Sequence, residues 1–473
     1  MTSALHVDLY QLTSLIPHVS RGHIDDRVVM TFFSRRLPQN PVTGETVRGY
    51  LIWAGLQRCL DYLESARFSE EGLACLERHP SLGPALMDMP SLIQRLRRWQ
   101  FSGTVHSPPE GTPIFAGSAL RMDGTPLEAH GVKPAAYIPY LVIETDLLSA
   151  KLIETPLLSI INHMTMVASK AAHIVSAARE GGNRPVVEFG SRRTHPAAAV
   201  DAALAAYIGG CSATSNVEAH FRYGIPATGT MDHFAVQAWE QPDQPRHETE
   251  FAFFQAFHQH YPDKDTLLVD TYDTFGEKTG IRNAVAATNG GPVAIRIDSN
   301  ITKGNLWKAR QLLDGLGAID TKILVSGGID EKVIRELADA AVDGFGVGEN
   351  LVVSSDAPVG VGAVGKLSMI RGHPTTKLAK GSGKAHLPGI LQVWRTPEFD
   401  LVGLHDEHQR GEPLLQVVWD KHGRKPAPSW ADVRRFAIDQ LSLLPTERKQ
   451  PRSIGLPVTD ALAQQLEALA SQI

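Results

Sequence analysis

The feature that most restricts the fold of this chain is an alternation of short apolar runs and helical segments over roughly residues 183–360. The apolar runs have the length of buried strands and read RPVVEFG, TLLVD, VAIRID, KILVSG and GFGVG. Between the last three lie NLWKARQLLDGLG and DEKVIRELADAA, whose patterns are typical of helices. Because strands that alternate with helices at this spacing form parallel βαβ units, we expect an α/β fold with a closed or nearly closed barrel here.

The chain on either side of this region predicts two further parts. Residues 1–150 mix short helices with strands, as expected of an N-terminal α/β domain. Residues 151–360 begin with an apolar-periodic stretch of one or two helices that ends at Gly181, and they continue into the barrel. Residues 361–473 hold loops rich in Pro and Gly and two more helices, and we expect them to pack back onto the N-terminal domain.

Composition and charge exclude several classes of function. The 473 residues are 43% hydrophobic and 21% charged, which is ordinary for a globular protein. The formal net charge of -5 argues against a nucleic-acid partner, because such binding needs a broad basic surface. The sequence has no run of 18 apolar residues to predict a membrane span, and its N-terminus lacks the basic region of a signal peptide. Since there are only three cysteines and no CxxC pair, we expect a cytoplasmic protein.

Two glycine-rich turns follow neighbouring predicted strands. ILVSGGIDE places Ser326, Gly327 and Gly328 between a strand and a helix, and GFGVGEN places Gly346 and Gly348 one βα unit later. Backbone N–H groups in such turns can close on a phosphate, and phosphate sites are common at this edge of a barrel. The alternative is that both are tight turns that only require a positive φ.

An arginine pair follows another predicted strand. EFGSRRTH places Arg192 beside Arg193, and guanidinium groups at a strand end suit bidentate contacts to a carboxylate or a phosphate. The alternative is one exposed arginine and one in a salt bridge.

Acids end two more strands. LLVDTYDT carries Asp270 and Asp273, and AIRIDSN carries Asp298, with Arg296 two residues earlier on the same strand face. These acids could bind ribose hydroxyls, hold Mg²⁺ through water or stabilise a developing cation. Capping of a helix N-terminus is the structural alternative.

The stretch GTMDHFAV contains His233 after what reads as a strand. A histidine in such a place is either a satisfied structural residue or a chemical one. Asp232 would point to the opposite face if the strand continued, so adjacency alone does not pair the two. Nothing in the spacing predicts a zinc site, and the sequence does not identify metal ligands. Together, these features favour a barrel enzyme that acts on a phosphorylated anion containing a sugar.

Over nearly its whole length the chain also resembles the nicotinate phosphoribosyltransferases. The motifs that carry the resemblance keep a common order and spacing: DLYQLT (8–13), EFGSRR (188–193), GGCSATSN (209–216), GTMDH (229–233), LLVDTYDT (267–274), RIDS (296–299), VSGGIDE (325–331), FGVG (345–348), SSDAP (354–358) and LPGILQVWR (387–395).

The resemblance implies an N-terminal α/β domain, an irregular α/β barrel and a C-terminal part joined to the first domain. It implies a homodimer with its sites at the interface. The reaction it implies converts nicotinate and phosphoribosyl pyrophosphate (PRPP) to nicotinate mononucleotide and pyrophosphate in NAD salvage, with Mg²⁺ as cofactor and ATP as co-substrate.

The resemblance also implies roles for individual residues. Phe189 would stack on the pyridine ring, with Tyr10 of the other subunit on the opposite face. Arg192 and Arg296 would contact substrate anions, and Asp298 would hold the ribose hydroxyls. His233 matches the histidine that the family phosphorylates from ATP. The remaining substrate-binding residues implied at the base and phosphate ends are Thr230, Asp270, Ser326, Gly327, Gly328, Gly346 and Gly348.

Two alternatives to this function stay open at the level of sequence. Ser212 and Phe234 differ from the usual family residues, which is compatible with transfer to a different aromatic acid or amide, with or without ATP. The other alternative is a non-catalytic relative that binds phosphoribosyl ligands.

Overall fold

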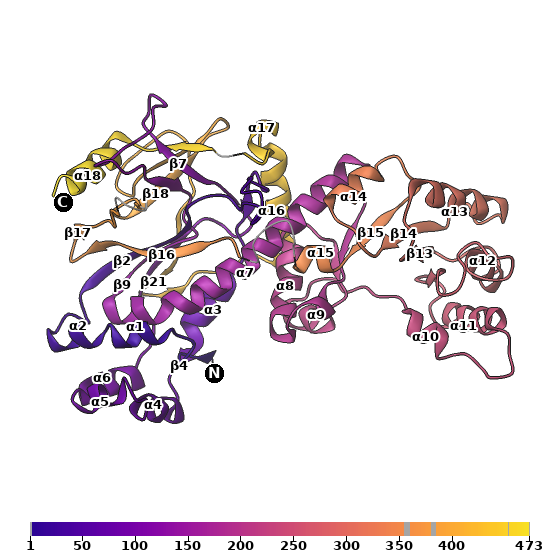
Figure 1. The fold of residues 1–473 in the computed structure, drawn as a ribbon, viewed down its shortest axis with the longest axis horizontal. Coiled ribbons are helices and arrows are strands. Elements are labelled where there is room, and N and C mark those ends of the chain that lie inside the picture. The colour runs from indigo at the N-terminus through magenta and orange to yellow at the C-terminus, as the bar shows by residue number, and fades with distance from the viewer. Residues whose placement is uncertain (1, 354–359, 380–384, 453, 473) are drawn as a thin grey trace. The chain divides into compact units, whose positions relative to one another are not determined.

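The computed structural model gives the fold as two compact units (Figure 1). Unit 1 comprises Met1–Ser169 and Asp356–Ile473, and unit 2 comprises Lys170–Ser355. The structure describes all residues except 1, 354–359, 380–384, 453 and 473.

Unit 1 is built on a seven-stranded sheet whose neighbours all pair antiparallel. Strands from the first 150 residues occupy its middle, and strands from the last 111 complete it on both sides. This arrangement confirms that C-terminal segments complete the N-terminal domain. In sheet order the strands are β17 (His373–Pro374), β16 (Ala363–Ile370), β2 (Arg27–Ser34), β9 (Leu141–Asp146), β5 (Gly103–Ser107), β21 (Gln416–Asp420) and β22 (Gly423–Arg424).

Helices and four small sheets surround this sheet. The helices of unit 1 are α1 (Leu9–Thr13), α2 (Ile16–Ser20), α3 (Leu56–Ser65), α4 (Glu70–Glu77), α5 (Gly83–Met87), α6 (Pro90–Arg97), α16 (Trp430–Leu443), α17 (Thr446–Lys449) and α18 (Asp460–Ala470). The small sheets are β1 (Thr2–Ser3) with β4 (Ala66–Arg67), β3 (Leu51–Ile52) with β6 (Pro113–Ile114), β23 (Gly455–Pro457) with β7 (Ala116–Leu120) and β8 (Ala135–Tyr137), and β19 (Asp400–Leu404) with β18 (Leu391–Arg395) and β20 (Glu412–Pro413).

The long apolar-periodic stretch forms a single helix, α7 (Leu147–Glu180), which runs 34 residues with Pro156 inside it. It ends where Gly182 adopts a φ of 117°, a conformation that favours glycine. Although α7 is long, no helix in the described part of the chain is apolar enough over 18 residues to cross a membrane.

Unit 2 contains six parallel strands in one sheet (Figure 1). The five runs RPVVEFG, TLLVD, VAIRID, KILVSG and GFGVG all form strands, and the α/β fold class is confirmed. β11 and β12 stand at opposite edges of the described sheet, so the sheet is a half-barrel and not a fully closed one. The sheet order is β11 (Ala213–Thr214), β10 (Val186–Glu188), β15 (Gly344–Val347), β14 (Lys322–Ser326), β13 (Ala294–Ile297) and β12 (Thr266–Leu268).

Helices connect these strands and leave their carboxyl ends at one edge of the sheet. They are α8 (Pro196–Ile208), α9 (Val217–Tyr223), α10 (His233–Gln237), α11 (Arg246–His260), α12 (Ile281–Ala287), α13 (Lys303–Gly315), α14 (Glu331–Glu336) and α15 (Glu349–Val352), with a 3₁₀ turn at Ser191–Arg193.

The expected strand before His233 is wrong. In residues 225–231 the ladder contact is a single bridge between Ala227 and Thr214, and His233 begins helix α10. The segment lies beside β11, but β11 has only two residues, Ala213 and Thr214, and the pairing stops at this one bridge.

Candidate active site

Unit 2 has a cavity of about 770 Å³ at the carboxyl ends of its strands.

 
Ligand pockets commonly have volumes of this order. The residues that line it come from the segments after β10, β11, β13 and β14 and from α10 and α11: Phe189, Ser191, Arg192, Ser215, Gly229, Thr230, Met231, Asp232, His233, Phe234, Ala235, Phe253, Phe257, Arg296, Asp298 and Ser326.

Phe189 supplies an aromatic face next to the strand end of β10. Its backbone N–H donates to the carbonyl of Val347, which fixes the residue against β15. A Cβ added to Gly346 would lie 2.4 Å from Cε2 of the Phe189 ring. Because Gly346 has no side chain, the Phe189 ring can lie close to the strand. Gly346 itself is not among the residues that line the pocket.

The two arginines of EFGSRRTH have separate environments. Arg193 forms an ion pair with Glu349, with 3.4 Å between Nη1 and Oε2. The side chain of Arg192 lines the pocket and makes no hydrogen bond or ion pair with another described residue. One arginine is thus in an ion pair, and the guanidinium of the other is unpaired at the pocket.

Arg296 is bound to the loop that leads to His233. Its Nη1 donates to Thr230 Oγ1 at 3.0 Å, and its Nη2 donates to the carbonyl of Met231 at 2.9 Å. Burial lowers the pKa of the guanidinium, and the nearby carboxylates of Asp298 and Asp270 oppose that shift. Its Nε is buried and has no partner in the described part of the chain.

Asp298 and Asp270 form one network at the ends of β13 and β12. Asp270 Oδ2 accepts from the backbone N–H of Asp298 at 2.9 Å and from Ser299 Oγ at 2.6 Å. The hydroxyl of Ser326 donates to Asp298 Oδ1. Asp298 faces the pocket, whereas Asp270 lies behind it and holds the turn that carries Asp298.

The Ser-Gly-Gly turn after β14 requires glycine for steric reasons. Gly327 has a φ of 91°, and a Cβ there would lie 2.2 Å from the carbonyl oxygen of Asp298. Gly328 has a φ of 68° with open space around it. Asn350 Nδ2 donates to the Gly328 carbonyl at 3.1 Å, which anchors the turn. The turn therefore brings Gly327 close to the backbone carbonyl of Asp298.

His233 is held through Nδ1, although not by its sequence neighbour. Asp232 is the N-cap of α10, and its carboxylate accepts from the N–H of Ala235 at 2.9 Å. The Nδ1 atom of His233 lies 3.0 Å from Thr271 Oγ1, and Nε2 lies 3.9 Å from Asp270 Oδ1. The side chain is 40% exposed and lines the pocket.

The structure thus brings together in one pocket many of the residues that the sequence suggests, namely Phe189, Arg192, Thr230, His233, Arg296, Asp298 and Ser326. Gly327 and Gly328 adjoin it in the turn after Ser326. Gly348 starts α15, where a Cβ would lie 3.2 Å from the Phe189 carbonyl oxygen. Tyr10 lies in unit 1 on α1, where it is 57% exposed.

Sequence reasoning missed the aromatic side of this pocket. Phe253 and Phe257 line it from α11, and Phe234 lines it from α10. The aromatic periodicity of α11 was visible in the sequence, but it includes Phe254, which is fully buried. Helical spacing alone does not say which ring faces a cavity.

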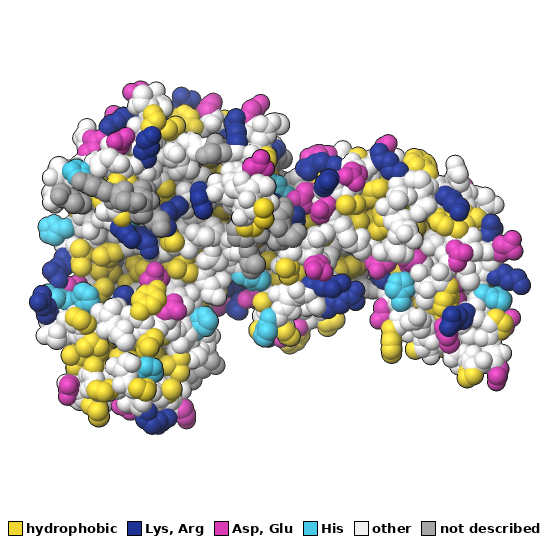
Figure 2. Space-filling view, in the orientation of Figure 1, with side chains coloured by type: hydrophobic (Ala, Val, Ile, Leu, Met, Phe, Trp, Pro, Cys, Tyr) yellow, Lys and Arg dark blue, Asp and Glu magenta, His cyan; other side chains and the backbone are white. Residues whose placement is uncertain are grey.

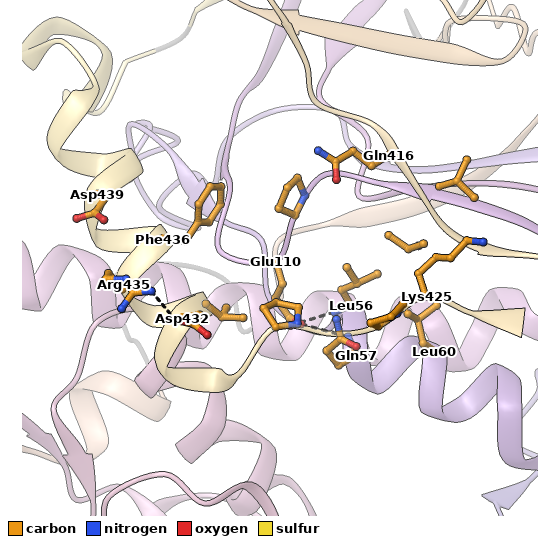
Figure 3. Close-up of a pocket in the computed structure, with 16 residues that line it drawn as sticks. Leu56, Gln57, Leu60, Glu110, Gln416, Lys425, Asp432, Arg435, Phe436 and Asp439 are labelled. Atoms are coloured by element: carbon orange, nitrogen blue, oxygen red, sulfur yellow. Dashed lines mark hydrogen bonds and ion pairs between the residues drawn. The ribbon is translucent and has the colours of Figure 1, made fainter.

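A second cavity, of about 560 Å³, lies within unit 1 (Figure 3). Its walls are largely apolar and include Leu56, Leu60 and Phe436. Glu110 at its base accepts hydrogen bonds from the first N–H groups of α3, and Arg435 is paired with Asp432. Its polar groups are therefore mostly satisfied within the protein.

The fold and the pocket of unit 2 define a class of protein: an α/β half-barrel with an aromatic face, an unpaired arginine and a carboxylate at the carboxyl edge of its sheet. Comparison with known families agrees with this class. Residues 5–132 match the nicotinate phosphoribosyltransferase (NAPRTase) N-terminal domain, and residues 167–357 match the quinolinate phosphoribosyl transferase C-terminal domain.

Comparison with individual proteins identifies the family within this class. Nicotinate phosphoribosyltransferase pncB1 of Mycobacterium tuberculosis is 38% identical over 375 residues, which cover 79% of this chain and 74% of the relative. Nicotinate phosphoribosyltransferase of Bacillus subtilis is 32% identical over 438 residues, covering 89% and 80%. The crystal structure of human nicotinic acid phosphoribosyltransferase has the same fold, with a TM-score of 0.77, 24% identity and coverage of 98% and 99%. The chain belongs to the nicotinate phosphoribosyltransferase family.

Proposed function

We propose that this protein transfers the phosphoribosyl group of PRPP to nicotinate, giving nicotinate mononucleotide and pyrophosphate in NAD salvage. The observation that carries the proposal is one pocket that joins the ring of Phe189, the unpaired guanidinium of Arg192 and the carboxylate of Asp298. A pyridine acid needs a ring face and a cation, and a ribosyl donor needs an acceptor for its hydroxyls. Family membership supports the same reaction.

The residues of the pocket suit the charges that develop in this reaction. The ring nitrogen of nicotinate forms a bond to C1′ of the ribose while the bond from C1′ to the pyrophosphate oxygen breaks, and pyrophosphate leaves with the electron pair. Positive charge grows on the sugar as that bond breaks. Asp298, fixed by Ser326, offers a carboxylate to the ribose hydroxyls and to that charge. The adjoining turn at Gly327 and Gly328 offers backbone N–H groups to the 5′-phosphate.

Mg²⁺ is the cofactor expected with a pyrophosphate donor. Within the described residues there is no group of three or more His, Cys, Asp or Glu side chains placed to hold a metal. Mg²⁺ is, however, commonly held by one or two carboxylates together with substrate phosphates. Asp298, which faces the pocket, and the buried, unpartnered Oδ1 of Asp270 fit that donor set. A bound ion would offset the negative charge of the leaving group.

His233 is the residue that we expect ATP to phosphorylate. The bond between its Nδ1 and Thr271 leaves Nε2 without a hydrogen bond, 3.9 Å from Asp270 Oδ1. Nε2 is therefore the nitrogen that would take the terminal phosphoryl group, forming an N–P bond as the P–O bond to ADP breaks. Hydrolysis of that bond would couple ATP to substrate binding.

A homodimer would complete the site in this proposal. Tyr10 is 57% exposed on α1 and is not needed for the core of its own unit. Its ring is available for the pyridine ring of the other subunit's site. Activity should then fall on dilution below the dimer dissociation constant, and a fully active monomer would contradict the role of Tyr10.

The test of the function is product formation from nicotinate and PRPP with Mg²⁺, measured by chromatography with and without ATP. We expect nicotinate mononucleotide and pyrophosphate in equal amounts, with faster turnover and ADP release when ATP is present. Turnover that is indifferent to ATP would remove the role of His233 and keep the transferase. Folded protein that forms no product from nicotinate would refute the proposed reaction.

A further inference from the structure

The helix that carries His233 is short and buries little of itself. α10 has five residues, of which Val236 is the buried one. Phe234 is 76% exposed, and hydrophobic side chains reach the surface in the region of α10 (Figure 2). Just after the helix, Trp239 packs against Phe253 of α11 but stays 44% exposed. Because a helix this short is not stable without support from the rest of the protein, the direction of His233 depends on what holds the two ends of α10.

The segment before α10 is held by two strands of the sheet. Arg296 of β13 donates to the hydroxyl of Thr230 and to the carbonyl of Met231. The backbone N–H of Leu268, in β12, lies 3.4 Å from Met231 Sδ. This end of the helix is therefore fixed to the sheet.

The segment after α10 is held by three side chains that are not among the residues lining the pocket. The hydroxyl of Tyr272 donates to Glu240 Oε1, and Arg246 Nε lies 3.4 Å from the same oxygen. The guanidinium carbon of Arg246 also lies 5.8 Å from the centroid of the Tyr272 ring. Burial, together with the Glu240 carboxylate, raises the pKa of Tyr272 to about 12. The hydroxyl therefore keeps its proton at neutral pH and is the donor of this hydrogen bond.

Tyr272 belongs to the loop that also contacts the ring of His233. Thr271 Oγ1 lies 3.0 Å from Nδ1 of His233, and Asp270 Oδ1 lies 3.9 Å from Nε2. The loop of residues 270–272 thus contacts the imidazole directly and, through Glu240, the chain that follows its helix. A shift of that end of α10 would move the ring relative to both contacts.

We propose that Tyr272 is a positioning residue for the phosphorylation of His233, because its hydrogen bond to Glu240 fixes the end of α10 and keeps Nε2 facing the pocket. The inference rests on the proposed function, in which Nε2 uses its lone pair to form a bond to the terminal phosphorus of ATP. The bond from that phosphorus to the ADP oxygen breaks, and ADP leaves with the electron pair. Since a misplacement of about 1 Å can slow a reaction about a hundredfold, the position of Nε2 is critical.

The test compares the full-length wild type with Tyr272→Phe, which keeps the ring beside Arg246 and removes the hydroxyl. One measurement follows the transfer of labelled terminal phosphate from ATP to the protein in the presence of Mg²⁺. We expect transfer at saturating ATP to slow by about tenfold or more, while the half-saturating ATP concentration stays within about twofold. The other measurement is hydrogen exchange by mass spectrometry without nucleotide. Exchange over residues 233–240 should become about threefold faster or more, with no change in β12 to β15.

Variants of Glu240 test the other partner of the hydrogen bond. Glu240→Met removes the acceptor and should slow phosphoryl transfer as much as Tyr272→Phe does. The double variant should be no slower than either single variant, because both remove the same bond. Glu240→Gln keeps an oxygen in the position of Oε1 and loses the charge that pairs with Arg246. Because the Arg246 side chain is 71% exposed, that ion pair contributes little, and Glu240→Gln should stay within about twofold of wild type.

Tyr223→Phe is the matched control, because it removes a hydrogen bond of the same kind in unit 2. The Tyr223 hydroxyl donates to Asp201 Oδ1 at 2.8 Å, and Tyr223 is not among the residues that line the pocket. Phosphoryl transfer and exchange over residues 233–240 should equal those of wild type. Equal slowing in Tyr223→Phe and Tyr272→Phe would overturn the proposal, since the loss would then be a general loss of stability.

Other outcomes separate the positioning role from the proposed function. Unchanged exchange over residues 233–240 in Tyr272→Phe, additive losses in the double variant, or an effect confined to the half-saturating ATP concentration would each refute the positioning role alone. If wild type takes up no label that His233→Ala lacks, the ATP step of the proposed function is refuted, and the positioning role with it. Product formation from nicotinate and PRPP without ATP would still test the transferase.

Discussion

Replacing Glu250 by Gln is expected to raise stability relative to wild type, and to raise it more at pH 8 than at pH 6. Glu250 is fully buried in α11. Its Oε2 accepts from the N–H of Gly280 at 2.8 Å and from Asn283 Nδ2 at 2.9 Å, while its buried Oε1 has no partner in the described chain. Burial raises the pKa of this carboxyl to about 7.

The raised pKa fixes the sign and size of the effect. The folded protein holds this proton more tightly than the unfolded chain, whose carboxyl has a pKa near 4.5. The stabilisation is therefore complete below pH 4.5 and is lost as pH rises through 7. Between pH 6 and pH 8 the loss amounts to about 1–2 kcal/mol of unfolding free energy. Gln has the shape of the protonated acid and cannot ionise, so Glu250→Gln escapes that loss.

Scanning calorimetry of wild type and Glu250→Gln between pH 6 and pH 8 measures the difference. The melting temperature of the variant relative to wild type should rise by roughly 3–5 °C over this range, if unit 2 melts as one unit of its size. A difference that stays constant with pH would refute the reasoning, because it would mean that Glu250 does not change its ionisation there.

Glu110 is the matched comparison, because burial also raises its pKa to about 7. Both of its oxygens are occupied, however: Oε1 accepts from the N–H groups of Gly55 and Leu56, and Oε2 accepts from that of Gln57 (Figure 3). An amide NH₂ in Glu110→Gln would face one of these donors. We therefore expect that variant to be about 1–3 kcal/mol less stable than Glu250→Gln at pH 6.

Three further predictions concern the pocket. Gly346→Ala should push the Phe189 ring from its place and raise the KM for nicotinate by about tenfold, with a smaller effect on PRPP, as steady-state kinetics would show. Gly327→Ala puts a Cβ against the Asp298 carbonyl at a φ of 91° and should reduce kcat/KM for PRPP by about a hundredfold or more. His233→Ala should abolish ATP stimulation and leave slow transfer, measured as product formed with and without ATP.

Gly328→Ala is the control for the turn, because a Cβ there has open space and only the φ of 68° resists it. It should cost about 1–2 kcal/mol of stability and keep most of the activity. Equal loss of activity in both glycine variants would show that backbone strain, and not the contact with Asp298, determines the effect. If Gly346→Ala leaves the KM for nicotinate unchanged, Phe189 is not the ring that binds it.

The strands and the polar strand ends could be predicted from the sequence because they obey local rules. Apolar runs such as KILVSG have the length of buried parallel strands, and parallel strands bring their carboxyl ends to one edge. That rule alone gathers Arg192, Asp298 and Ser326 in one pocket. The structural alternative for the arginine pair holds for one of the two, because Arg193 forms a salt bridge with Glu349.

The environment of His233 could not be predicted because it depends on residues far along the chain. Its contacts come from Asp270 and Thr271, nearly 40 positions away, while Asp232 caps the helix. Whether a segment pairs as a strand depends on a neighbouring strand, which the local pattern does not reveal. Residues 225–231 pair with their neighbour through one bridge only.

The two pocket arginines also show why a residue type in the right place does not fix its role. Arg296 ends β13 beside the acids, as a substrate ligand would, yet its Nη1 and Nη2 are bound to Thr230 and to the carbonyl of Met231. Arg192 has no such partner and remains available. Arg296 keeps its positive charge while its hydrogen bonds hold the loop. An anion in the pocket is therefore attracted by both guanidinium groups, although only Arg192 is free to form hydrogen bonds with it. A chain with a net charge of -5 can thus hold a highly charged substrate, and the same arginine that adds attraction keeps the loop before His233 in place.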